Sequence, residues 1–132
     1  MRPSNTTIVD FYQGAYGPTL RIDVQDASWL KAFQSHMAQL ANRNITEFDL
    51  LHLDGVEKGE ISGLRFRLDF ESSLTIVTPK QTGKYESFLW TLDMESIERI
   101  TDVVDRFLES NRPGHYYLYD EDQTLVELAF KE

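Results

Sequence analysis

Hydrophobic and polar residues alternate strictly along residues 63–70. Leucine or phenylalanine occupies each even position from 64 to 70, and Arg65, Arg67 and Asp69 stand between them. Successive side chains of an extended strand point to opposite faces, so the pattern predicts a strand with one wholly apolar face. That face, which includes Phe70, needs a cover, and two amphipathic helices elsewhere in the chain can supply it.

Two longer stretches carry the helical period of apolar residues. The first covers residues 27–42, and Asp26 or Ser28 can cap its N-terminus. The second covers about residues 94–110 and stops at the Asn-Arg-Pro-Gly sequence of residues 111–114. The residues expected to be buried are Trp29, Leu30, Phe33, Met37 and Leu40 in the first helix and Ile97, Ile100, Val104, Phe107 and Leu108 in the second.

Shorter apolar runs between turn residues predict the strands. The predicted strands cover residues 6–12, 20–24, 46–53, 61–70, 74–78, 85–92, 115–120 and 125–130. The first two and the last two are expected to form hairpins, and the segment before residue 61 is expected to be a polar loop. Three consecutive strands with short turns in the middle of the chain favour an antiparallel meander.

These elements predict an α+β fold, a mostly antiparallel sheet of about seven or eight strands with two amphipathic helices packed on it. A chain of 132 residues is long enough to bury roughly two-thirds of its unfolded surface in one core. No linker divides it, so we expect a single domain over residues 1–132.

The two predicted helices align after a shift of 67 residues. Any two amphipathic helices share some apolar coincidence, so the alignment alone does not establish a duplication. The aligned pairs are Asp26 and Asp93, Leu30 and Ile97, Phe33 and Ile100, Met37 and Val104, and Leu40 and Phe107.

Composition is that of a globular protein, with 41% hydrophobic and 12% aromatic residues. No run approaches the roughly 20 apolar residues of a membrane span, and the first residues lack the apolar core of a secretory signal. The absence of cysteine excludes disulfides and cysteine nucleophiles and fits a reducing compartment. We therefore expect a cytoplasmic location.

The net charge of −9 is concentrated toward the end of the chain. Residues 93–132 carry eleven acids and four bases, whereas residues 1–92 carry eleven acids and nine bases. Phosphates repel such a chain, so nucleic acids and anionic membranes are not expected partners. The acidic balance serves solubility alone, or it forms a face for a basic protein partner.

The candidate catalytic residues do not form a motif. His36 borders the first apolar stripe, His52 and Asp54 lack a third metal ligand, and His115 shares a strand face with tyrosines, which favours a structural or interfacial role. No Gly-x-Ser-x-Gly elbow, Walker loop or dinucleotide-binding glycine pattern is present. We therefore expect no enzyme activity, no cofactor and no metal site.

The second helix carries the most informative polar pattern. Four acidic residues recur at spacings of +4, +3 and +4, which places them on one face, and Arg99 and Arg106 relieve part of their repulsion. The face is either simply solvated or an anionic surface that steers a cationic protein into contact. Together with the acidic hairpin turn and two tyrosines, the candidate partner-binding residues are Glu95, Glu98, Asp102, Asp105, Glu109, Tyr117, Tyr119, Asp120, Glu121 and Asp122.

The strand at residues 115–120 is rich in tyrosine. An edge strand of this kind can pair with another chain or supply amphipathic contacts, and a homodimer is one such outcome. A buried central pair of strands explains the same residues, so both interpretations stay open.

The run Gly114-His115-Tyr116-Tyr117-Leu118, followed by the apolar strand 125–130, resembles the C-terminal strand pair of small bacterial immunity proteins. The resemblance implies a compact, acidic, cytoplasmic α+β protein that binds and blocks a cognate toxin. We therefore expect a non-enzymatic immunity- or antitoxin-like inhibitor that occludes a basic toxin domain. The alternative is a small-molecule-binding or enzymatic domain with a pocket between sheet and helices, lined by Trp29, Trp90 and tyrosines.

Overall fold

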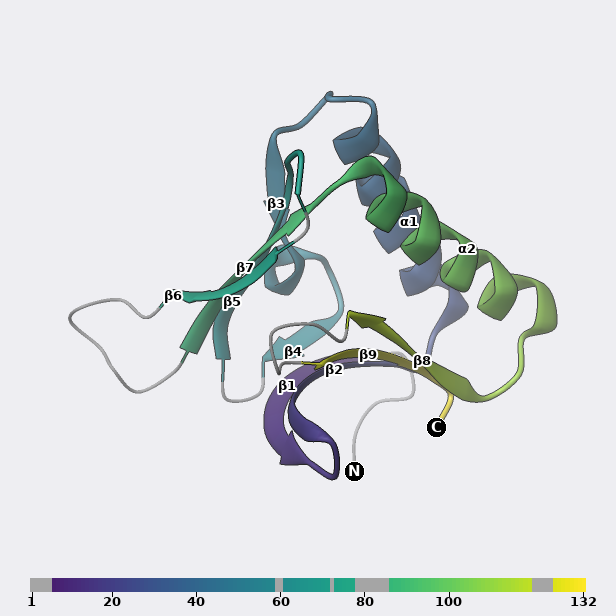
Figure 1. The fold of residues 1–132 in the computed structure, drawn as a ribbon. Helices are drawn as coiled ribbons and strands as arrows, with labels where there is room; N and C mark the ends of the chain where they lie inside the picture. The colour runs from purple at the N-terminus through teal and green to yellow at the C-terminus, as the bar shows by residue number, and fades with distance from the viewer. Residues whose placement is uncertain (1–5, 59–60, 72, 78–85, 120–124) are drawn as a thin grey trace.

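The computed structural model describes residues 6–58, 61–71, 73–77, 86–119 and 125–132. Within these ranges the chain forms two helices and nine strands in two mixed sheets, so the predicted α+β class is confirmed (Figure 1). The elements are β1 (Thr7–Gly14), β2 (Gly17–Val24), α1 (Ala27–Ala41), β3 (Glu47–Asp49), the 3₁₀ turn η1 (Leu50–His52), β4 (Val56–Lys58), β5 (Ile61–Leu68), β6 (Ser73–Val77), β7 (Glu86–Leu92), α2 (Met94–Ser110), β8 (Gly114–Tyr119) and β9 (Leu125–Phe130).

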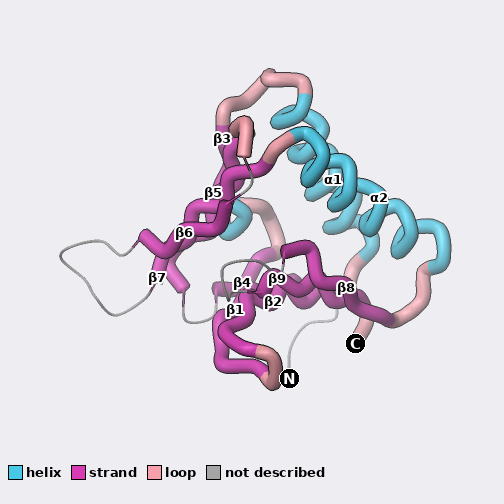
Figure 2. The backbone as a smooth tube through the Cα atoms, viewed as in Figure 1, coloured by secondary structure: helices cyan, strands magenta, loops and turns pink. Residues whose placement is uncertain are grey.

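The strands divide between a five-stranded sheet, ordered β4-β1-β2-β9-β8, and a four-stranded sheet, ordered β3-β5-β7-β6. In Figure 2 the two sheets lie at an angle to each other, and α1 and α2 lie side by side across the same side of both. Each helix carries the chain from one sheet to the other. The chain passes from β2 in the five-stranded sheet through α1 to β3 in the four-stranded sheet. It returns from β7 in the four-stranded sheet through α2 to β8 in the five-stranded sheet.

The predicted meander is wrong. β5 pairs in parallel with β7, and β6 pairs only with the far side of β7. This order sets Phe66 of β5 beside Trp90 of β7, with ring centroids 5.2 Å apart, and both side chains are fully buried. In a meander β6 would lie between β5 and β7, and the rings of Phe66 and Trp90 would not be in contact. Packing of these rings in the core therefore favours the observed strand order over the order that short connections predict.

The helix limits and both hairpins are confirmed. The carboxylate of Asp26 accepts a hydrogen bond from the Ser28 backbone at 3.0 Å, and that of Asp93 accepts one from the Ser96 backbone at 2.7 Å. α2 ends at Ser110, and the following residue, Asn111, caps it with a φ of 53°, the left-handed conformation that closes helices. The predicted stripes of both helices are buried, although Leu108 is only partly so.

The region between α1 and β5 differs from the expected strand and loop. β3 stops at Asp49, because the Asp49 carboxylate caps η1 through the Leu51 N–H and also accepts the Leu64 N–H. The predicted polar loop then contributes β4, which pairs in parallel with β1.

Phe70 is not in the core, contrary to the alternation pattern. Leu64 and Phe66 are fully buried and Leu68 is partly buried, but β5 ends at Leu68 and the Phe70 side chain is 95% exposed. The backbone N–H of Asp69 still reaches β7, at 2.8 Å from the Leu92 carbonyl oxygen, while the Asp69 carboxylate accepts the N–H of Phe70. β7 ends at Leu92, just before α2 begins, so Phe70 lies beyond the last bond that joins the chain to β7 and the period-two rule stops applying there.

The two halves of the chain share one topology. The order β1-β2-α1-β3-β5 recurs as β6-β7-α2-β8-β9, with β4 and η1 as additions in the first half. In both halves the first two strands pair with each other, the last two pair with each other, and a parallel pairing joins the halves within each sheet. Each sheet thus takes one strand pair from each half.

The register of the strands repeats as well. Each half has a backbone hydrogen bond at the equivalent place. Lys131 N–H donates to the Val24 carbonyl oxygen, and Asp69 N–H donates to the Leu92 carbonyl oxygen, both at 2.8 Å. The alignment of the two helices, which sequence alone left open, coincides with this repeated arrangement. The equivalent strand pairs are Val9–Ile22 and Leu74–Trp90, Ile22–Leu128 and Trp90–Phe66, and Tyr116–Leu128 and Phe48–Phe66.

Candidate functional site

The acidic face of α2 is solvent-exposed, as the helical spacing predicts. Its buried side packs with Phe107 against Tyr116 and Phe130, at centroid distances of 5.4 Å and 5.3 Å. The opposite side carries the carboxylates, and Asp105 also accepts a hydrogen bond from Gln34 of α1. We call the exposed acidic residues Glu95, Glu98, Asp102, Asp105 and Glu109 the α2 acidic face.

The neighbouring helix does not balance this charge. The exposed surface of α1 is made mainly of small or uncharged residues, with Lys31 as the charged exception. Arg99 and Arg106 on α2 itself are exposed, and the Arg99 guanidinium lies 3.4 Å from the Leu118 carbonyl oxygen. The α2 acidic face therefore retains an excess of negative charge.

Phe70 lies next to the start of α2 and extends that surface with an apolar group. A hollow of about 400 Å³ on one side of Phe70 also touches Glu95 and Tyr119, and a second hollow of about 320 Å³ touches Met94, which is 42% exposed. Sequence periodicity missed this residue because it assigned Phe70 to the core. The signal available was its position between two acids at the end of the strand. We call the surrounding carboxylates Asp69, Glu71, Asp93 and Glu95 the acidic collar.

Within the described residues β8 lies at the edge of the five-stranded sheet, whereas β9, the other strand of the last hairpin, lies inside the sheet and is mostly buried. Tyr117 is 44% exposed and available as a contact residue. Tyr119 is only 4% exposed, and the centroid of its ring lies 5.8 Å from that of Trp90, so its side chain packs mainly in the core. A register shift between Tyr117 and Tyr119 turns Leu118 and Tyr119 together toward the core.

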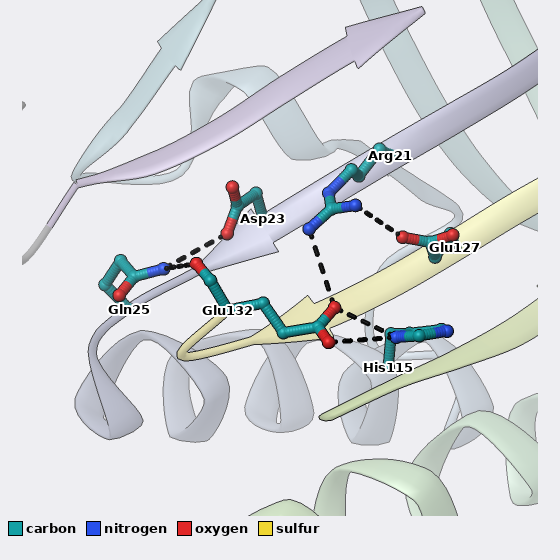
Figure 3. Close-up of polar contacts among 6 residues, drawn as sticks. All are labelled: Arg21, Asp23, Gln25, His115, Glu127 and Glu132. Carbon is teal, nitrogen blue, oxygen red and sulfur yellow. Dashed lines mark hydrogen bonds and ion pairs between the residues drawn. The ribbon is translucent and has the colours of Figure 1, made fainter. Parts of the chain in front are cut away.

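The outer face of the five-stranded sheet holds a polar network (Figure 3). Arg21 of β2 pairs with Glu127 of β9 at 2.9 Å, and Glu127 is only 5% exposed. Burial is the largest single influence and acts to lower the pKa of Arg21, but the Glu127 carboxylate, Tyr12 and Asp23 together outweigh it and the pKa is raised. Tyr117 also donates to Glu127, and loss of hydration together with the charge of Glu127 raises the Tyr117 pKa.

The same network holds Glu132. Its carboxylate lies 2.9 Å from His115 Nδ1 and 3.6 Å from an Arg21 nitrogen, while Gln25 donates to its backbone oxygen at 3.1 Å. Figure 3 shows that these side chains come from β2, from β8 and from the residues that follow β2 and β9. His115 thus has a structural partner, which agrees with the role expected from its strand.

The other two histidines border an open hollow of about 460 Å³. His36 Nδ1 lies 2.9 Å from the Ala32 carbonyl oxygen, and its ring packs on Phe48. His52 lies 3.8 Å from Asp49, in place of the pairing with Asp54 that the spacing suggested. Within the described ranges, no group of three or more His, Asp or Glu side chains is arranged to hold a metal ion.

The alternative of a pocket between sheet and helices lacks support at the predicted position. Trp29 and Trp90 are 5% and 0% exposed, and they pack against Phe33 and Phe66 in the core. The acidic turn of Asp120, Glu121 and Asp122 lies outside the described residues.

Comparison of the chain with protein-family models, curated proteins and solved structures finds no match. Neither α1 nor α2 has the length and apolar character that crossing a membrane requires, and they are the helices of the described part of the chain.

Proposed function

We propose that this chain is a non-enzymatic protein-binding module that holds a basic protein against the α2 acidic face. The observation that carries the proposal is the exposure of five carboxylates along one helix beside a nearly uncharged α1. Such a surface attracts a cationic partner from a distance and raises its association rate.

The α2 acidic face is not explained by helix stability. Like charges at i,i+4 each cost a few tenths of a kcal/mol, and Glu109 lies in the last turn of α2, where the helix dipole disfavours an anion. No basic residue occupies that last turn to offset it. Binding of a positively charged partner offsets the repulsion among these carboxylates.

The resemblance of the last two strands to immunity proteins suggests the mode of action. An inhibitor that covers the active site of a basic toxin domain needs a complementary surface and no chemistry of its own. We propose this occluding, immunity- or antitoxin-like role in the cytoplasm.

The test starts from the tagged chain in a lysate of its native cells, at low and high salt. Retained proteins are identified by mass spectrometry, and the affinity of the purified partner is measured at several salt concentrations. We expect one basic protein that is retained at low salt and released by salt. Retention of no basic protein at low salt contradicts the proposal.

A matched pair of variants locates the contact. E98K/D102K and D54K/E57K change the net charge equally, and all four positions are exposed. We expect E98K/D102K to weaken binding and flatten its salt dependence, and D54K/E57K to retain most of the affinity. Equal effects of the two variants would show that overall charge, and not the α2 acidic face, governs binding.

A further inference from the structure

The most exposed large apolar side chain in the described part of the molecule lies beside the α2 acidic face. Phe70 is 95% exposed, so its ring packs against almost nothing in the folded chain. Single exposed apolar residues are common on protein surfaces, but Phe70 also lines two neighbouring hollows.

The repeated topology supplies an internal comparison. Asp69 and Lys131 make equivalent backbone bonds to Leu92 and Val24, so Phe70 and Glu132 are the equivalent next residues. The chain itself holds Glu132 through His115, Arg21 and Gln25. Glu132 is thus fixed by contacts within the chain, whereas Phe70, at the corresponding position of the other half, exposes a large apolar ring to solvent.

The surroundings of Phe70 define what can cover it. Met94 and Leu68 add apolar surface, and the four carboxylates of the acidic collar outnumber the guanidinium groups of Arg43 and Arg99. A second copy of this chain docked across Phe70 would set one acidic collar against another. A basic surface with an apolar cavity complements both the ring and the charge.

We infer that Phe70 is the apolar anchor of the partner-binding surface, inserted into an apolar pocket of a basic protein whose lysines and arginines meet the acidic collar. The inference rests on the proposed function, because Glu95 belongs to both the acidic collar and the α2 acidic face. A buried aromatic at the centre with charges around it is the usual arrangement of an energetically dominant contact.

Photo-crosslinking of the full chain tests which molecule binds over Phe70. p-Benzoylphenylalanine replaces Phe70 in one variant and Tyr16 in the control, because Tyr16 is an aromatic residue that is 82% exposed in the β1–β2 turn. We expect position 70 to crosslink to an apolar segment of a basic protein in the native cells, and position 16 not to reach that protein. A crosslink to a second copy, a lipid product, or no product at position 70 overturns the inference.

Affinity measurements separate this inference from the proposed function. F70A is expected to weaken binding about tenfold or more while leaving the salt dependence unchanged, whereas Y16A leaves both unchanged. Thermal unfolding of F70A serves as the folding control. If E98K/D102K weakens binding and F70A does not, the anchor is wrong and the proposed function stands. If the unmodified chain binds no basic protein, both fail.

Discussion

Trp90 of β7 lies directly beside Phe66 of β5 across a parallel strand pair, and Ile22 and Leu128 take the equivalent positions in the other sheet. All four side chains are fully buried. These two pairs lie where the halves of the chain meet, so the core depends on contacts between residues far apart in sequence.

Phe66 and Phe70 belong to the same alternating run, but their replacement should affect stability very differently. F66A removes a buried ring that contacts Phe33, Phe48 and Trp90, and we expect it to lower the free energy of unfolding by about 3–5 kcal/mol. F70A removes an exposed ring and should change it by no more than about 0.5 kcal/mol. Urea unfolding of both variants makes the comparison, and similar losses would place Phe70 in the core.

The difference between Phe66 and Phe70 shows what sequence periodicity can predict here. The helix limits, their buried stripes and the two hairpins follow from local spacing and capping residues, so they were predicted correctly. The exposure of Phe70 depends on where the pairing of β5 with β7 ends, and the burial of Tyr119 depends on a bulge in β8. Neither event changes the alternation of residue types, so the pattern could not reveal it.

The strand order could not be predicted from the sequence for a different reason. The parallel pairing of β5 with β7 is fixed by the fit of Phe66 against Trp90, which involves segments separated by β6. The acidic residues of α2 were found because helical spacing alone determines their face. The proposed anchor was missed because its role depends on where a strand ends.

Removal of the α2 N-cap should destabilise the chain in a pH-dependent manner. Hydrogen bonds from the Ser96 side chain and backbone N–H lower the pKa of Asp93. The folded pKa lies below the unfolded one, so this stabilisation is complete above the unfolded value near 4 and is lost as pH falls through the folded value.

We therefore expect D93A to cost about 1 kcal/mol at pH 7 and progressively less as the pH approaches 3. Urea unfolding of D93A and the unmodified chain between pH 7 and 3 measures the difference. S35A on the exposed side of α1 serves as a control with little effect at any pH. A cost for D93A that stays constant with pH would contradict the role of the ionised cap.

The Arg21–Glu127 pair should behave as a buried ion pair. R21M leaves the carboxylate of Glu127, which is 5% exposed, without its cation, and we expect a loss of about 2 kcal/mol or more. R21M/E127M removes both charges and should recover part of that loss. A double-mutant cycle by urea unfolding measures the coupling, and additive losses would show that Glu127 stays well solvated.

Glu109 offers a test in which stability and binding change in opposite directions. E109K replaces an exposed anion in the last turn of α2 with a cation, which the helix dipole favours there, so we expect stability to rise by about 0.3–1 kcal/mol. The same change removes part of the α2 acidic face and should weaken binding of the basic partner and reduce its salt dependence. Thermal unfolding and the binding measurement are made on the same preparation. A variant that is stabilised and binds normally would remove Glu109 from the contact, whereas stabilisation with weaker binding indicates that this acid is retained for the partner at the expense of the helix.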